Sequence, residues 1–487
     1  MIRLRLAEIA DATGGVVIGP DGAPADGAPA DGAPADAAAS TSVTGGVVID
    51  SREAEEGSLF VALPGEHVDG HDYVATAIAR GAASALVARP VPGVATPLVQ
   101  VPDVQRALGD LARHVLSRLR LAADVRVVAI TGSVGKTSTK DLLAQLLTPL
   151  GGVIAPVGSF NNEIGLPLTV LRADRSTRVL VLEMGADAPG NITYLTAIAP
   201  PDVAVVLAVG SAHLGRFGSV DAIAAAKAEL VQGLRQHGLA VLNADDARVA
   251  AMAPLAAGER VVTFGKNPDA DVRAVGVSTD AEGHASFTLL HSGARADVTL
   301  ALFGEHHVAN ALAAVAVAVE LGRPLAEVAR TLATAAALSA HRMHVVDTPG
   351  GVRVIDDAYN ANPDSTRAAL EALAVMTGRD RRSVAVLGEM LELGEASVTE
   401  HDAIGRLVVR LDIARLVVVG AGAYPIHTGA RREGAQGEVS TFVETIEDAW
   451  ELLRTELRPG DVVLVKSSKG AGLARLGDQL TTLGQAT

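Results

Sequence analysis

The chain has 487 residues, a length that corresponds to about three domains of ordinary size. Hydrophobic residues make up 49% of the sequence and charged residues 20%, which excludes a mainly disordered chain. The net charge of −15 and the aromatic content of 2% argue against a nucleic-acid-binding protein, and the absence of cysteine excludes disulfides and thiolate metal sites.

The sequence also predicts the compartment. No apolar run approaches the ~18 residues of a membrane span. The N-terminal stretch lacks the apolar core and the cleavage site of a signal peptide. We therefore expect a cytoplasmic protein with no membrane span and no nucleic-acid partner.

The first predicted domain covers residues 1–122. Within it, residues 21–36 repeat a five-residue Asp/Gly/Ala/Pro unit that cannot build a core, which predicts a flexible insertion. Short apolar runs around the insertion predict a small α/β domain. Its strands are expected at 45–50, 58–63 and 85–88, and its helix at 71–81.

The second predicted domain covers residues 123–338. A buried strand leads through a glycine-containing turn into a helix, and further strands alternate with helices, which predicts a mostly parallel sheet. A β-rich extension and an apolar helix follow. The strands are expected at 125–130, 179–183, 203–207 and 239–243, the helices at 136–150, 220–236 and 310–321, and the extension at 261–303.

The third predicted domain covers residues 339–487 and repeats the α/β pattern, with strands expected at 352–356, 384–387, 416–420 and 461–465. The fold class is therefore α/β in three domains. These are a small N-terminal α/β domain, a central P-loop mononucleotide-binding domain with a parallel sheet, and a C-terminal Rossmann-like α/β domain.

The turn after residue 130 reads TGSVGKTS and indicates a phosphate-binding loop. Backbone N–H groups of such a turn, at the start of a helix, favour phosphate. Lys136 can reach the β- and γ-phosphates of ATP, and the Thr137 hydroxyl can bind Mg²⁺. Ile130 occupies the position of the first glycine in the standard pattern, so the match is to its short form. The predicted ATP contacts in the loop are Gly132, Ser133, Val134, Gly135, Lys136, Thr137 and Ser138.

Three further residues predict a metal site. Glu183 ends a buried strand, and His213 follows the next strand, so both belong to the strand ends where ligands bind in such sheets. Lys227 lies on the following helix among alanines. Taken singly, each has an ordinary reading as a capping acid, a structural histidine or a solvated lysine. Together they predict a site near the phosphate loop.

Motifs along nearly the whole chain resemble those of the Mur ligases of peptidoglycan synthesis, specifically the MurF type. NNEIGLP at 161–167 and DDAYNANP at 356–363 are typical of that type, whereas the phosphate loop indicates only the superfamily. Further matches are DSR at 50–52, DGH at 69–71, EMG at 183–185, AHLGRFGS at 212–219, GEH at 304–306, GEMLELG at 388–394 and VKSS at 465–468.

The resemblance implies an ATP-dependent ligase. ATP would convert the terminal carboxylate of UDP-N-acetylmuramoyl-tripeptide into an acyl phosphate, and the amine of D-Ala-D-Ala would displace phosphate through a tetrahedral intermediate. Two Mg²⁺ ions are implied, one on Thr137 and one on Glu183 and His213. The family's helix lysine is carbamylated by CO₂, which assigns a metal-organising carbamate to Lys227. Lys136, Lys227, Glu183 and His213 are therefore the expected catalytic residues, and a monomer is expected.

The resemblance also implies further contacts. The first domain would hold the nucleotide-sugar end of the substrate, the second domain would bind ATP, and the third domain would bind the dipeptide. Closure of the domains over the substrates would exclude water. Asn310, Arg342 and Asp357 resemble nucleotide contacts. The expected substrate contacts are Ser51 and Arg52 for the uridine diphosphate, Asn161 and Asn162 for the sugar-peptide, and Tyr359, Asn360, Asn362 and Lys466 in the third domain.

Three alternatives stay open. A sister ligase would add a single amino acid or glutamate by the same chemistry. A P-loop regulatory ATPase would couple hydrolysis to motion, but the third domain and the departure from the standard loop spacing argue against it. A decayed nucleotide-binding protein would not be expected to keep Lys136, Thr137, Glu183, His213 and Lys227 together.

Overall fold

The computed structural model describes residues 1–20, 22–24, 40–65, 68–256, 258–434 and 439–484. Apart from residues 22–24, the predicted insertion at 21–36 lies outside the described residues. The chain divides into two compact units. The first contains Met1–Ala129, Thr148–Met184 and Asn191–Asp202, and the second contains Ile130–Leu147, Gly185–Gly190 and Val203–Thr487. Within the described ranges, no helix is both long and apolar enough to cross a membrane.

The first unit contains a five-stranded sheet with the order β2-β7-β6-β5-β4, in which only the β2–β7 pair is antiparallel. Its core includes Phe60, Val74 and Ala85. Strand β4 is shorter than the predicted 45–50 because glycines 45 and 46 are poor strand formers and Asp50 caps a 3₁₀ turn instead. The strands are β2 (Val16–Ile18), β4 (Val47–Val48), β5 (Leu59–Val61), β6 (Ser84–Val87) and β7 (Leu98–Gln100).

Helix α4 (Val104–Ala122) is the longest helix of the first unit. The side chain of Asp103 accepts a hydrogen bond from the backbone N–H of Arg106, which satisfies one of the free donors at the helix start. Buried residues recur every three or four positions along one face, as in Leu108, Leu111 and Val115, so this face packs into the core.

The other elements of the first unit are short. They include β10, which pairs in parallel with β9 and ends at Glu183. Their bounds are β1 (Leu4–Arg5), α1 (Leu6–Thr13), β3 (Ser42–Val43), α3 (Val74–Ala79), β9 (Gly152–Ile154), α6 (Gly165–Leu171), β10 (Thr177–Glu183) and α7 (Asn191–Ile198). Strand β8 (Arg126–Thr131) lies next to β10 in the sheet order and leads into the phosphate loop.

In the second unit, six strands lie side by side in chain order from β11 to β16. Pairing is parallel from β11 to β14 and antiparallel from β14 to β16, which confirms the β-rich extension predicted at 261–303. The strands are β11 (Val203–Val206), β12 (Leu239–Asn243), β13 (Arg260–Gly265), β14 (Val272–Thr279), β15 (His284–His291) and β16 (Ala294–Phe303).

Helices surround this sheet at bounds that partly differ from those predicted. Helix α5 ends at Leu146 instead of residue 150, because Pro149 restricts Thr148 and breaks the helical pattern. Helix α9 ends at Gln232, where Gly233 follows. Helix α11 begins one turn before the predicted residue 310. The helices are α5 (Lys136–Leu146), α8 (Leu214–Phe217), α9 (Val220–Gln232), α10 (Ala247–Ala250), α11 (His307–Glu320) and α12 (Leu325–Leu332).

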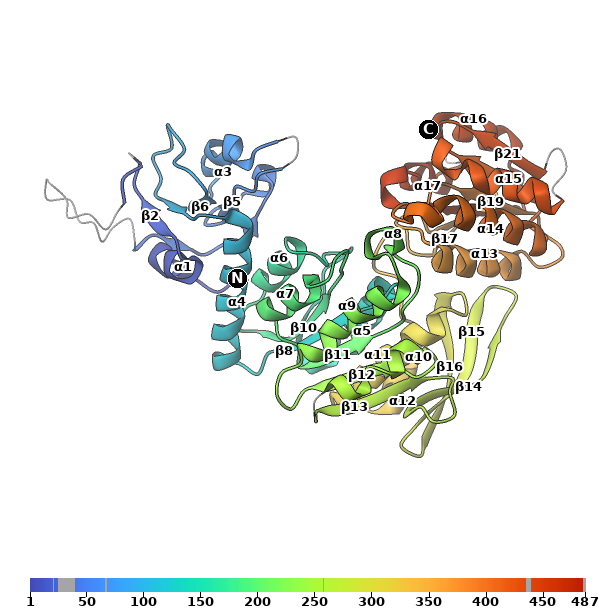
Figure 1. Ribbon diagram of the computed structural model, residues 1–487, viewed down its shortest axis with the longest axis horizontal. Helices are drawn as coiled ribbons and strands as arrows, with labels where there is room; N and C mark the ends of the chain where they lie inside the picture. The colour runs from blue at the N-terminus through green and yellow to red at the C-terminus, as the bar shows by residue number, and fades with distance from the viewer. Residues whose placement is uncertain (21, 25–39, 66–67, 257, 435–438, 485–487) are drawn as a thin grey trace, which may run out of the picture. The chain divides into compact units, whose positions relative to one another are not determined.

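The C-terminal part of the second unit is doubly wound (Figure 1). Its sheet has the order β17-β18-β22-β19-β20-β21, and only the β17–β18 pair is antiparallel. Helices α13, α14 and α15 contribute to the core on one face, and α16 and α17 to the core on the other.

Bounds of these strands are β17 (His344–Asp347), β18 (Arg353–Asp356), β19 (Ser383–Leu387), β20 (Arg415–Val419), β21 (Ser440–Val443) and β22 (Val462–Lys466). The helices are α13 (Pro363–Thr377), α14 (Ser397–Arg410), α15 (Tyr424–Glu433), α16 (Ile446–Glu456) and α17 (Ala474–Thr481). Because β22 lies between β18 and β19, the strand order reverses there, and the carboxyl ends of such strands form a ligand crevice.

A buried ion pair joins α5 to the start of the C-terminal part. Nζ of Lys140 lies 2.6 Å from Oδ1 of Asp141, and both side chains are almost fully buried. Oδ2 of Asp141 accepts hydrogen bonds from the backbone N–H groups of Leu338 and Ser339. Asp141 therefore satisfies a lysine and two backbone donors at once.

We expect Asp141→Ala to destabilise the second unit by about 3 kcal/mol or more, because the buried Lys140 loses its carboxylate partner. The melting temperature should fall by roughly 6–12 °C. Asp221→Ala is the matched control, since it removes an exposed pair with Arg248 worth at most about 1 kcal/mol. Equal shifts of the two variants in a thermal unfolding experiment would contradict this account.

Candidate active site

The phosphate loop runs from the end of β8 to the start of α5. The backbone N–H of Ser133 donates to the carbonyl of Ala208, and Oγ of Ser133 accepts from the N–H of Gly210, so the loop is held against the segment after β11. Nζ of Lys136 lies 2.6 Å from the carbonyl oxygen of Gly132. The lysine is thus folded over its own loop, at the helix start where phosphate is favoured.

Gly135 caps α5 with a positive φ of 85°, a conformation that favours glycine. A Cβ atom at this position would lie 2.2 Å from Oδ1 of Asn310 on helix α11. The close approach of loop and helix therefore requires a glycine here. It also places Asn310, a predicted nucleotide contact, directly against the phosphate loop.

A cavity of about 270 Å³ lies at this junction in the second unit. It brings together the phosphate loop, the start of α11, the start of α13 and the carboxyl ends of β18 and β22. Residues predicted from the sequence that line it are Val134, Gly135, Ser138, Asn310, Arg342, Asp357 and Lys466.

Cationic groups of the C-terminal part lie close to the phosphate loop. An Nη of Arg342 donates to Oγ1 of Thr137 at 3.2 Å, and its guanidinium stacks 4.2 Å from the centre of the Tyr359 ring. Nζ of Lys466 lies 2.5 Å from Oδ2 of Asp357 and donates to the carbonyl of Asn360. Burial lowers the pKa of Lys466, and the Asp357 carboxylate opposes this effect.

The N-terminus of α13 also contacts the loop. Asn362 caps the helix by accepting a hydrogen bond from the N–H of Ser365, and its Nδ2 donates to the carbonyl of Ser133 at 3.4 Å. Oδ2 of Asp364 accepts from the N–H and Oγ of Ser211 at 3.1 Å. Asp364 was missed by the sequence analysis, although it directly follows the NANP motif.

Two adjacent histidines form one wall of the cavity. Burial lowers the pKa of His306 to about 4, and it lowers the pKa of His307 well below the usual value. Both rings are therefore neutral at pH 7, and Nδ1 of His307 faces the side-chain amide of Asn310 at 3.3 Å. Their wall is polar but uncharged, a surface that suits hydrogen bonding to a neutral heterocycle.

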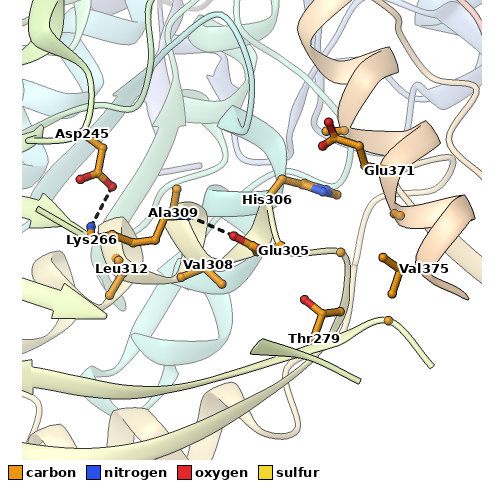
Figure 2. Close-up of a pocket in the computed structure, with 14 residues that line it drawn as sticks. Asp245, Lys266, Thr279, Glu305, His306, Val308, Ala309, Leu312, Glu371 and Val375 are labelled. Atoms are coloured by element: carbon orange, nitrogen blue, oxygen red, sulfur yellow. Dashed lines mark hydrogen bonds and ion pairs between the residues drawn. The ribbon is translucent and has the colours of Figure 1, made fainter. Parts of the chain in front are cut away.

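His306 also borders a second cavity, of about 320 Å³ (Figure 2). It lies between the start of α11, the β14–β15 turn and α13, and it shares Ala309 and Ala368 with the first cavity. Lys266 and Glu305 on its wall form an ion pair at 3.0 Å. The other charged residues of its lining, Asp245 and Glu371, are acidic and disfavour an anion, whereas the first cavity has the loop and the cations that suit a nucleotide.

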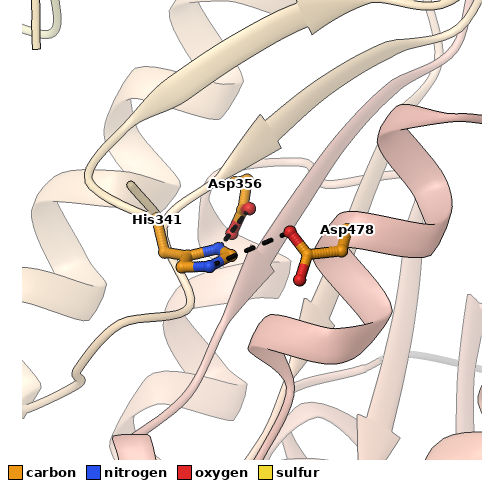
Figure 3. A group of neighbouring side chains, drawn as sticks. All are labelled: His341, Asp356 and Asp478. Atoms are coloured by element: carbon orange, nitrogen blue, oxygen red, sulfur yellow. Dashed lines mark hydrogen bonds and ion pairs between the residues drawn. The ribbon is translucent and has the colours of Figure 1, made fainter. Parts of the chain in front are cut away.

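His341, Asp356 and Asp478 form a cluster beside the crevice (Figure 3). Nδ1 of His341 lies 2.6 Å from Oδ2 of Asp356, whose Oδ1 accepts from the N–H of Ala358. The residue types could hold a cation, but both oxygens of Asp356 already have partners. The cluster therefore fixes the strand end that precedes Asp357 and the segment that carries Arg342.

Lys227 on α9 has an environment that favours a neutral amine. Its side chain is 4% exposed. Burial, and to a smaller extent the charge of Lys136, lower the pKa of Lys227 to about 7. No described carboxylate offsets this effect. An unprotonated lysine amine is the form that reacts with CO₂, so the chemistry of this residue fits a carbamate.

His213 stands at the start of α8 with a positive φ of 61°. Its Nδ1 lies 2.5 Å from Oε2 of Glu392, in the loop after β19. The His213 imidazole holds the pKa of Glu392 below its usual value, since this contact outweighs the effect of burial. The second imidazole nitrogen could bind a metal ion, and the Thr137 hydroxyl and the oxygens of a carbamate on Lys227 are of the donor type that Mg²⁺ prefers.

The remaining predicted residues belong to the first unit. Glu183 is fully buried at the end of β10 and accepts a hydrogen bond from Ser159. Oδ1 of Asn162 accepts from the N–H of Gly165 at the start of α6, and Asn161 precedes it in the same loop. In the 3₁₀ turn Ser51–Glu53, Ser51 is buried and the exposed Arg52 pairs with Asp50 at 2.6 Å.

Comparison with known proteins identifies the family. Three family models match: "Mur ligase family, catalytic domain" over residues 44–115, "Mur ligase middle domain" over 130–318 and "Mur ligase, glutamate ligase domain" over 341–469. A UDP-N-acetylmuramoyl-tripeptide–D-alanyl-D-alanine ligase of Mycobacterium tuberculosis is 49% identical, with 99% of this chain and 98% of the relative covered. The Bacillus subtilis enzyme of the same name is 34% identical, with 89% and 93% covered.

Solved structures agree. The crystal structure of MurF from Acinetobacter baumannii matches with a TM-score of 0.84 and 30% identity, covering 99% of both chains. MurF ligase from Thermotoga maritima, solved in complex with ADP, matches with a TM-score of 0.77 and 30% identity, covering 90% of this chain and 97% of that one. The chain therefore belongs to the Mur ligase family, and within that family to the MurF type.

Proposed function

We propose that this protein joins D-Ala-D-Ala to the terminal carboxylate of UDP-N-acetylmuramoyl-tripeptide at the cost of ATP. The observation that carries this proposal is the 270 Å³ cavity, in which a phosphate loop meets Arg342, Asp357 and Lys466 from the C-terminal part. A phosphate site joined to a second set of cations suits phosphoryl transfer to an acceptor, which a simple nucleotide-binding module would not need.

In the first step, the substrate carboxylate attacks the γ-phosphorus of ATP, and ADP leaves. Negative charge develops on the transferred phosphoryl oxygens, where Lys136 and Arg342 stabilise it. In the second step, the neutral amine of D-Ala-D-Ala attacks the acyl carbon. The tetrahedral intermediate then expels phosphate with one former carboxylate oxygen, and the amine loses a proton as the peptide bond forms.

Metal ions belong to the same proposal. When bound, Mg²⁺ would supply positive charge that offsets the negative charge of ATP and of the substrate carboxylate. Thr137 would hold one ion, and His213 and carbamylated Lys227 would hold a second. The assignment of Glu183 to that second ion stays a prediction from the sequence, as do the monomeric state and the cytoplasmic location.

The first unit supplies the proposed contacts to the nucleotide-sugar. Arg52 is suited to this role because its pair with Asp50 is exposed to solvent and therefore weak. The guanidinium can exchange that carboxylate for the diphosphate, to which it can bind bidentately. Ser51, Asn161 and Asn162 offer donors and acceptors for the rest of the substrate.

Phosphate release tests the proposed function. With ATP and Mg²⁺, we expect release to require both UDP-N-acetylmuramoyl-tripeptide and D-Ala-D-Ala, and mass spectrometry should find a product heavier by the dipeptide residue mass. Phosphate release supported by a single amino acid or by glutamate would show that the protein is a sister ligase. Release that needs neither substrate would indicate a regulatory ATPase.

The pKa of Lys227 predicts the pH dependence of carbamate formation. The lysine is mostly protonated below pH 7 and mostly neutral above it, so reaction with CO₂ should rise through about pH 7. At constant dissolved ¹³CO₂, a carbamate signal in the ¹³C NMR spectrum should grow between pH 6 and 8 and should be absent from Lys227→Met. A signal that grows only above pH 9, as for an ordinary lysine, would contradict this prediction.

A further inference from the structure

The loop after β19, residues 388–394, lies on the segment that carries His213. The carbonyl of Glu392 accepts a hydrogen bond from the N–H of Gly215 at 3.0 Å. A Cβ atom on Gly215 would lie 2.4 Å from the nitrogen of Gly394, and one on Gly394 would lie 2.8 Å from the Cα of Gly215. The two glycines therefore let the loop and helix α8 meet backbone to backbone.

The Glu392 side chain uses both carboxylate oxygens at this contact. Oε2 lies 2.5 Å from Nδ1 of His213, and Oε1 lies 3.2 Å from an Nη of Arg216. Arg216 also pairs with Asp187. The Arg216 guanidinium thus orients the Glu392 carboxylate, and the carboxylate in turn contacts the His213 imidazole. These charge-assisted contacts connect the three side chains in series.

The loop that presents Glu392 is held in place from the C-terminal part. The N–H of Met390 donates to Nε2 of the buried His401, and the N–H of Leu391 donates to Oγ of Ser468. Glu392 itself has a positive φ of 64°, which is unfavourable for a residue with a side chain. A backbone conformation of this kind persists only where the surrounding contacts impose it. The contacts of the loop therefore hold the Glu392 carboxylate in this position.

The contact between His213 and Glu392 is of a kind that occurs at metal sites. A histidine that binds a metal through one ring nitrogen commonly donates its other N–H to a carboxylate, which fixes the tautomer and the ring orientation. A proton on Nδ1, the nitrogen that lies against Glu392, would leave the lone pair of His213 on Nε2.

We propose that Glu392 is a positioning residue for His213, which fixes the Nε2 tautomer so that the metal site is complete only while the 388–394 loop lies on α8. This inference rests on the proposed metal role of His213. It extends that role by making a residue of the C-terminal part a determinant of metal affinity, although it does not contact the metal.

The test uses Mn²⁺ as the probe, on the full chain with ADP, with the dissociation constant measured by electron paramagnetic resonance. Glu392→Ala should weaken Mn²⁺ binding by about tenfold or more. Glu392→Gln should weaken it less, because the amide oxygen can still accept from Nδ1–H. Glu395→Ala, at the position directly after the loop, should match the wild type because its exposed side chain lies outside this chain of contacts. Thermal unfolding of each variant checks that the fold is kept.

The ¹⁵N spectrum of the His213 ring provides a second measurement. We expect a protonated Nδ1 and an unprotonated Nε2 in the wild type, and mixed tautomers in Glu392→Ala. If Glu392→Ala binds Mn²⁺ like the wild type while His213→Ala does not, the contact is only structural and the inference is wrong. If His213→Ala also binds normally, the metal role of His213 fails, and with it this inference. Ligation of D-Ala-D-Ala is assayed separately, so failure of the proposed function remains distinguishable.

Discussion

Lys136→Ala is expected to lower kcat by about 10³-fold or more, with a much smaller change in the affinity for UDP-N-acetylmuramoyl-tripeptide. The Lys136 amine lies over the phosphate loop, 2.6 Å from the carbonyl of Gly132, at the positive end of α5. ATP phosphates would replace that carbonyl as its partner. The charge on the transferred phosphoryl group is greatest in the transition state, so kcat should show the larger loss.

Lys266→Ala is the matched control for this variant. It removes the same charge, but from an exposed pair with Glu305 on the second cavity. We expect at most a twofold change in kcat for this control, as for other exposed pairs. If the Lys136→Ala variant kept more than a tenth of wild-type turnover, the phosphate loop would have no major role in catalysis and this prediction would be wrong.

Lys227→Ala is expected to lower kcat by about 100-fold or more, and added short-chain carboxylic acids should restore part of the lost activity. The buried amine has no described carboxylate beside it, and the charge of Lys136 disfavours its protonated form. A carbamate would change this position from a repelled cation to an anionic ligand. A small acid can occupy the space left by the truncated side chain and supply the two missing oxygens.

The rescue has an internal control. The same acids should leave Lys136→Ala inactive, because that variant lacks a cation and not an anion. Near-normal turnover of Lys227→Ala, or loss of activity without any rescue, would argue that Lys227 acts through its amine or through packing alone.

Most of the strands and helices could be predicted from local sequence patterns. Strand β8, the glycine turn and helix α5 follow from about twenty consecutive residues, and the alternation at 261–303 predicts the β13–β16 extension. Helix ends were less predictable because they depend on single residues such as Pro149. That proline stops α5 at Leu146, whereas the apolar pattern alone continues to residue 150.

The candidate site was predictable only where its residues are recognisable by type. The loop and Asp357 stand in motifs, and Arg342 was predicted from the family resemblance, but the contact of Asn362 with Ser133 joins residues far apart in the chain. Nothing local indicates that contact. Lys227 was ambiguous because alanines on most sides of α9 give no contrast between a buried and an exposed face, and the fold alone buries its side chain.

Glu392 illustrates the same limit. Its GEMLELG motif supports the family resemblance, yet the sequence assigns no role to the acid. The role depends on the backbone approach of Gly215 to Gly394, which only the folded chain provides. Asp364 is similar, since its contact with Ser211 depends on the placement of the α13 start.

One isotope experiment tests the central claim that ATP activates the substrate carboxylate. The terminal carboxylate of UDP-N-acetylmuramoyl-tripeptide is labelled with ¹⁸O at both oxygens, and the released phosphate is analysed after reaction with ATP and D-Ala-D-Ala. The acyl-phosphate mechanism predicts one ¹⁸O atom in each phosphate and one in the new amide. Unlabelled phosphate, with both labels still in the carboxylate, would contradict the account, because ATP would then be hydrolysed without activating the substrate.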